Sequence, residues 1–173
     1  MAKSELEGTS LLQVARDHLP TGRGRPRPAL LRRVISTAYY AGFHALANEV
    51  TTHVGNEEAQ LAARRLIAHT NIRGVCRSLL QSRTIPWMTG EPACHSDLLR
   101  FVTSFEALYL ARIRADYDHR YHCTKRDADD AISNAQGVID ALAAAATSCR
   151  EQLDFVAIAV LADDRNRKHL RVS

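Results

Sequence analysis

The sequence is poor in the residues that build turns and β-sheets, and it has no long apolar run. It contains only five prolines and eight glycines among 173 residues, and aromatic residues make up 6%. This composition, rich in alanine and leucine, favours helices over a β-sandwich. No apolar segment reaches the roughly 18 residues of a membrane span, and the first residues lack the apolar core of a signal peptide. We therefore predict a cytoplasmic protein that makes no contact with a membrane.

The cysteines lack the spacing of a metal site or of a disulfide framework. Four are present, with no C-x-x-C pair among them: Cys76, Cys94, Cys123 and Cys149. His119 and His122 lie close to Cys123, but three ligands so near one another are poor geometry for zinc without a distant fourth. We predict reduced thiols, no bound metal and no cofactor.

The charge is mildly basic, with 23 Lys and Arg against 19 Asp and Glu and a formal net charge of +4. Nearly all of the basic residues are arginine, which binds phosphate oxygens bidentately. This balance is compatible with a nucleic-acid partner, although genome base composition alone also produces chains rich in arginine and alanine. Hydrophobic residues make up 46%, which is ample for the core of one domain.

Apolar residues recur every three or four positions along most of the chain, which predicts amphipathic helices. We expect these helices over residues 4–19, 29–53, 57–82, 96–117 and 124–150. The third loses its apolar register at residues 70–74, where we expect a kink or a break. Residues 151–164 fit a helix face or a buried strand, and we favour a helix because no other segment offers a partner strand.

These elements predict an all-α protein with an up-and-down bundle of about five helices over residues 1–150. Residues 151–173 are expected to form a C-terminal helix and a basic tail that pack on the bundle or extend from it. The loop at residues 21–28 carries Arg23, Arg25 and Arg27. This loop is either a solvated linker or an arm that touches phosphate.

The candidate catalytic residues lie at the end of the fourth predicted helix. Arg114, His119 and Tyr121 form an Arg-x4-His-x-Tyr arrangement there. An arginine followed at such a spacing by a histidine arises often by chance in this chain. Three such pairs are present: Arg64–His69, Arg112–His119 and Arg114–His119. Only the last pair has one member in the final turn of a helix and the other just beyond it, where the chain reversal can bring the two side chains together.

Two segments together resemble the HEPN family of bacterial and archaeal proteins. Residues 31–44, LRRVISTAYYAGFH, are similar to its second-helix signature, with Thr37 where the family often has arginine. Residues 114–117, RADY, are similar to its R-x-A-D-Y-D segment, and a capped alanine-rich helix follows in both. The order of the helices agrees over about residues 5–150.

The resemblance implies a HEPN-like bundle that forms a homodimer through the helix bearing the motif. Two copies of Arg114 and His119 would then face each other across a shared cleft. Active members of the family are metal-independent ribonucleases, often toxins paired with a nucleotidyltransferase-type antitoxin. In some pairs the antitoxin adenylylates the tyrosine of the motif, here Tyr121, and many other members are not known to cut RNA.

The residues suit metal-free RNA cleavage, in which the ribose 2′-OH attacks the neighbouring phosphorus. His119 would act as general base because histidine titrates near neutral pH, and Arg114 would stabilise the charge that develops on the phosphate. Asp116 or Asp118 would orient the imidazole. Tyr121 completes the predicted catalytic set, and the supporting residues are Asp116, Tyr117, Asp118, Arg33, Tyr40 and His44.

Two alternatives remain open on the sequence alone. Arg114 and His119 could instead cap the fourth helix, where cations favour the C-terminal end of the helix dipole, with Asp116 and Asp118 as ion-pair partners. The chain could also be a non-catalytic HEPN module that binds a protein, a nucleotide or RNA.

Overall fold

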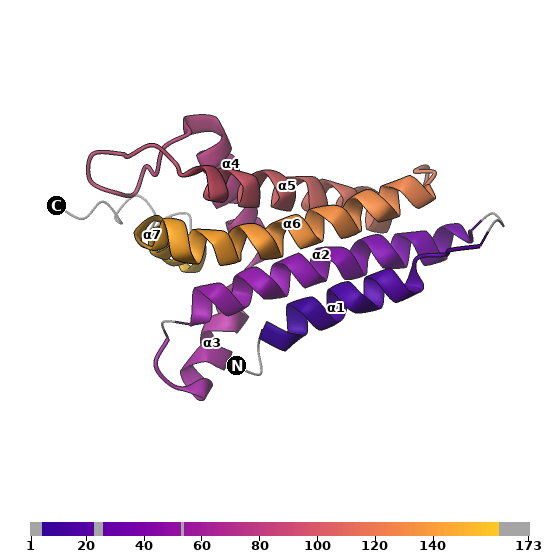
Figure 1. Ribbon diagram of the computed structural model, residues 1–173, viewed down its shortest axis with the longest axis horizontal. Helices are drawn as coiled ribbons and strands as arrows, with labels where there is room; N and C mark the ends of the chain where they lie inside the picture. The colour runs from indigo at the N-terminus through magenta and orange to yellow at the C-terminus, as the bar shows by residue number, and fades with distance from the viewer. Residues whose placement is uncertain (1–4, 23–25, 53, 163–173) are drawn as a thin grey trace.

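The computed structural model describes residues 5–22, 26–52 and 54–162, and within these ranges the chain is helical, with a single isolated bridge between Thr84 and Ala93. Figure 1 shows most of the helices lying side by side in an elongated bundle. The prediction of an all-α protein is confirmed. The helices are α1 (Glu5–His18), α2 (Pro28–Thr51), α3 (Glu57–Leu66), α4 (His69–Ser82), α5 (Ser96–Tyr117), α6 (Lys125–Ser148) and α7 (Arg150–Leu161).

The central helix is α2, which packs against α1, α5 and α6. It is apolar on most sides, and Leu31, Ile35 and Leu46 are among its fully buried side chains. Each such side chain contributes about 1.5–3 kcal/mol when it leaves water. A Cβ on Gly42 would lie 3.1 Å from Cδ1 of Leu108, so glycine here allows α2 and α5 to approach closely.

Figure 1 shows the end of α1 and the start of α2 at the same end of the bundle as the connection between α5 and α6. Thr124 caps α6 with a capping box, in which the side chains of Thr124 and Asp127 each accept a hydrogen bond from the other residue's backbone N–H. This end of the bundle therefore carries the residues that follow α5 together with the start of α2.

The predicted third helix is in fact two helices, and its break comes earlier than predicted. α3 ends at Leu66 and α4 begins at His69, so residues 70–74 lie inside α4. Ile67 has an extended backbone, with φ −74° and ψ 104°, and its side chain is buried. The break turns the chain so that Ile67 and the apolar face of α4 both reach the core. Arg64 and His69 therefore belong to different helices.

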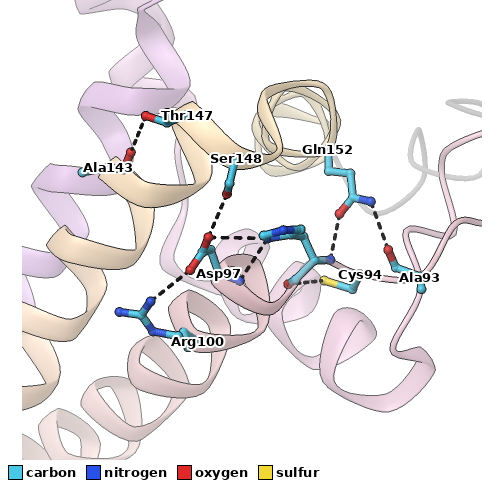
Figure 2. Close-up of polar contacts among 9 residues, drawn as sticks. Ala93, Cys94, Asp97, Arg100, Ala143, Thr147, Ser148 and Gln152 are labelled. Atoms are coloured by element: carbon cyan, nitrogen blue, oxygen red, sulfur yellow. Dashed lines mark hydrogen bonds and ion pairs between the residues drawn. The ribbon is translucent and has the colours of Figure 1, made fainter.

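Residues 150–161 form a helix rather than a strand, as we favoured. α7 packs against α2, α4 and α6, and Figure 2 shows how its start is tied to the loop before α5. The side chain of Gln152 accepts from the backbone N–H of His95 at 2.9 Å and donates to the carbonyl of Ala93 at 3.0 Å. Ser148 donates to the carboxylate of Asp97 at 2.7 Å.

Trp87, in the loop at residues 83–95, is 7% exposed and packs into the hydrophobic core. All four cysteines carry free thiols. No helix in the described ranges is long and apolar enough to cross a lipid bilayer. Of the residues singled out above, Arg23, Arg25 and the basic tail beyond residue 162 lie outside the described residues.

Candidate functional site

The predicted motif lies in the last turn of α5 and in the tight turn that follows it. Arg114 is exposed on α5, and His119 is exposed just beyond the end of the helix. The backbone N–H of Tyr121 donates to the carbonyl of Asp118 at 3.2 Å, which places His119 and Arg120 at the tip of the turn. The Asp118 carboxylate accepts from the backbone N–H of Arg120 at 2.9 Å. Asp118 therefore stabilises the turn itself.

Arg32 holds this turn in place, although the sequence analysis did not single it out. It lies near the start of α2 and donates to the carbonyls of Ala115, Asp118 at 3.0 Å and Tyr121 at 2.6 Å. The last carbonyls of a helix have no partner within the helix. Arg32 supplies that partner, so the capping role that Arg114 and His119 were considered for belongs to a residue of another helix.

Two guanidinium groups lie near the ring of Tyr121. The Cζ atoms of Arg32 and Arg114 are each 5.9 Å from the centre of its ring. Burial and a hydrogen bond to the Asp127 carboxylate raise the pKa of Tyr121 to about 12. Burial alone would raise the pKa of Asp127, but hydrogen bonds from Thr124 and Tyr121 and the charge of Arg114 lower it. Arg114 thus contacts the tyrosine of the motif and stabilises the carboxylate behind it.

A second polar cluster lies on the other side of α5 and includes Asp116. The Arg112 Nε is 2.8 Å from Oδ2 of Asp116, and Ser36 on α2 donates to the same carboxylate. The Arg112 guanidinium lies 5.1 Å from the centre of the Tyr117 ring. Burial would lower the pKa of Arg112, but Tyr117, Asp116 and Tyr40 raise it. Asp116 is therefore engaged by α2 and by its own helix, and not by His119 as the sequence analysis considered.

The supporting residues predicted on α2 separate into different surroundings. Arg33 is exposed, whereas Tyr40 and His44 lie near His69, the first residue of α4. His69 was also missed by the sequence analysis. Its Nδ1 is 2.6 Å from the hydroxyl of Tyr39, a fully buried side chain. The contact could not be inferred because the break between α3 and α4 sets where His69 lies.

We predict that His69 makes the stability of the fold depend on pH. Burial, and then the charges of Arg112 and His44, lower the pKa of His69 below its ordinary value of 6.5. The unfolded chain therefore binds a proton more readily, and the free energy of unfolding falls as the pH drops below about 6.5. Urea denaturation at pH 7.5 and 5.0 should show a larger loss for the wild type than for His69→Gln. An equal loss in both proteins would contradict this role of His69.

Within the part of the chain that is described, no contact joins Arg114 to His119, and neither side chain is covered. Both groups therefore remain available to a ligand or to a second copy of the chain. One copy offers the exposed His119 at the tip of this turn beside the exposed guanidinium of Arg114 in the preceding helical turn, and a second exposed imidazole, His122, lies three residues further along the connection. Acid–base cleavage of RNA needs one group to take a proton and another to give one. In a dimer that joins the two turns, the second group would be His119 of the partner subunit.

Comparison with protein-family models, with curated proteins and with solved structures found no match. The geometry of the described residues is therefore what the functional proposal rests on.

Proposed function

We propose that this chain is a metal-independent endoribonuclease of the HEPN type that acts as a homodimer. The observation that carries the proposal is the exposed His119 at the tip of a turn that Arg32 fixes by bonding two of its carbonyls. An uncovered imidazole on a fixed backbone turn, beside an uncovered arginine, is suited to proton transfer at a phosphodiester. Nothing else in the described chain requires a histidine at this exposed position.

The proposed reaction needs two proton transfers, one from the attacking 2′-OH to a base and one from an acid to the leaving 5′ oxygen. His119 of one protomer takes the proton of the ribose 2′-OH as that oxygen attacks the phosphorus. His119 of the partner subunit gives a proton to the 5′ oxygen as the bond from phosphorus to that oxygen breaks. Arg114 stabilises the negative charge on the other phosphate oxygens. The products are a 2′,3′-cyclic phosphate and a 5′-hydroxyl end.

The proposal includes an antitoxin of the nucleotidyltransferase type as a partner, with Tyr121 as the residue that it modifies. The Tyr121 hydroxyl is bonded to Asp127, and its pKa is raised to about 12. Modification would replace this hydrogen bond and put a bulky anion between Arg32 and Arg114. Both guanidinium groups would then pair with the added phosphate, which removes Arg114 from the RNA.

The proposal is tested by incubating the purified protein with single-stranded RNA in excess chelator. We expect cleavage that leaves cyclic phosphate and 5′-hydroxyl ends, because the 2′-OH is the nucleophile. The specific activity should fall on dilution in step with the dimer fraction measured by sedimentation. Cleavage that requires a divalent metal, or activity that is independent of dimer concentration, would contradict the proposal. Absence of cleavage at every concentration would favour the non-catalytic binding module.

A further inference from the structure

Two tyrosines on the α2–α5 side of the bundle are exposed in a chain with few aromatic residues. Tyr117 is 61% exposed and Tyr40 is 37% exposed. The other three tyrosines are buried or half-buried. A large aromatic ring left in contact with water at the end of a helix adds nothing to the core. Its exposure is typical of a surface that binds something flat and apolar.

Arg112 connects the two exposed rings. Its side chain is only 13% exposed, and its guanidinium lies 5.1 Å from the centre of the Tyr117 ring. Burial would lower the pKa of Arg112, but Tyr117, Asp116 and Tyr40 raise it, so both exposed tyrosines interact with this guanidinium. The ion pair with Asp116 at 2.8 Å fixes the guanidinium, and the bond from Ser36 fixes Asp116. The two rings are therefore held in position before any ligand arrives, which lowers the entropy cost of binding.

We propose that Tyr117 and Tyr40 form a stacking platform for unpaired bases of single-stranded RNA. The inference rests on the proposed function and names the form of its substrate. Bases stack on tyrosine rings whatever their identity, and a neighbouring arginine adds a cation–π contribution. Tyr117 ends α5, two residues before His119, so a strand stacked on it would lie at the same end of the bundle as the imidazole.

The charges around the platform favour RNA over an apolar protein surface. Arg33 is exposed and lies two helical turns before Tyr40 on the same edge of α2, with Thr37 between them. The Arg112 guanidinium, although it is ion-paired with Asp116, lies 5.1 Å from the centre of the Tyr117 ring. Cations interleaved with exposed rings are typical of grooves that follow a single-stranded backbone.

The test measures binding and not cleavage, in a His119→Ala background that leaves the RNA intact. The probe is a fluorescein-labelled RNA of mixed sequence about 12 nucleotides long, within the range that one single-strand site covers. Replacing Tyr117 by alanine or by leucine should weaken binding about 5- to 100-fold, the usual value of one stacked base. Tyr117→Phe should bind within about twofold of the parent, because the ring is kept.

The leucine variant distinguishes base stacking from simple apolar contact. Ile158 is 47% exposed on α7, so Ile158→Ala is a control for the loss of an exposed apolar side chain elsewhere. Equal RNA binding by all variants would overturn the proposal. The proposal would also be overturned if the Tyr117 variants bound RNA normally but self-associated more weakly in sedimentation, because the rings would then form a protein contact. If wild-type protein cleaves but Tyr117 variants bind normally, the platform fails and the proposed function stands. If wild-type protein does not cleave but binding needs the Tyr117 ring, the platform stands alone.

Discussion

His119→Ala is expected to reduce the rate of RNA cleavage about 10²- to 10⁴-fold, which is the usual contribution of a general acid or base. In the proposed dimer the substitution removes both the base and the acid, so the loss should lie towards the upper end of this range. His119 is exposed, and no hydrogen bond of its side chain is present in the described ranges. The substitution should therefore leave the melting temperature and the dimer fraction unchanged.

The matched control is His122→Ala, three residues further along the same connection. His122 is also exposed, and the proposed chemistry does not use it. We expect His122→Ala to cleave at close to the wild-type rate, while Arg114→Ala should lose about 10²-fold or more through the missing charge at the phosphate. If the folded His119→Ala protein cleaved RNA as fast as the wild type, the proposed catalytic role of this turn would be wrong.

Arg32→Met should destabilise the fold and lower the rate of the proposed RNA cleavage together. The methionine keeps an apolar stem of similar length but leaves the carbonyls of Ala115, Asp118 and Tyr121 without their charged donor. A hydrogen bond from a charged group contributes about 1.5–3 kcal/mol. Because two of the three acceptors are partly buried and water can reach the third, we expect the free energy of unfolding to fall by about 2–3 kcal/mol. Chemical denaturation measures this loss.

Arg32→Met should slow the proposed cleavage because it displaces His119, and not because Arg32 takes part in the reaction. Without Arg32 the turn is free to move, and a displacement of about 1 Å in a catalytic group can cost about 10²-fold in rate. Hydrogen exchange should show loss of protection at residues 118–124. Arg33→Met is the control for stability, because Arg33 is the next residue of α2 and is exposed, so its loss should change the free energy of unfolding by less than about 0.5 kcal/mol. A stable Arg32→Met protein with unchanged exchange would show that the turn does not depend on this arginine.

The helices were largely predictable because their apolar periodicity is strong and their ends carry clear signals. The fourth predicted helix has the same bounds as α5, and Thr124 begins the next helix with the capping box that its sequence indicates. The break between α3 and α4 was misplaced because both sides of it are helical by propensity. What decides its position is the burial of Ile67, and that depends on the core already formed by the other helices.

The contacts around the candidate site could be predicted only where the residues are close in sequence. Arg114 and Tyr121 belong to one short segment, and the Arg114 guanidinium lies 5.9 Å from the centre of the Tyr121 ring. On α2 the sequence pattern favoured Arg33 over Arg32, whose partners lie more than eighty residues away in sequence. A difference of one residue on a helix rotates the side chain by about 100°, and only the packing of α2 on α5 determines which arginine faces the turn.

The partners of Asp116 and Arg112 on α5 were also not predictable from the sequence. Asp116 was a candidate partner for His119, but its carboxylate is taken by Arg112 and Ser36. Arg112 itself appeared only as a chance pairing with His119. Its role in holding Tyr40 and Tyr117 depends on contacts between two helices, which the order of the residues does not contain.

A crystal structure of the dimer with an uncleavable RNA dinucleotide tests the central claim most directly. We predict that the two-fold axis passes between the α5 ends, with both His119 rings within about 3 Å of oxygens of one phosphodiester group and Arg114 bonded to its remaining oxygens. A dimer whose His119 rings lie too far apart to reach the same phosphate, or whose interface leaves the turn after α5 alone in solvent, would contradict the proposed ribonuclease.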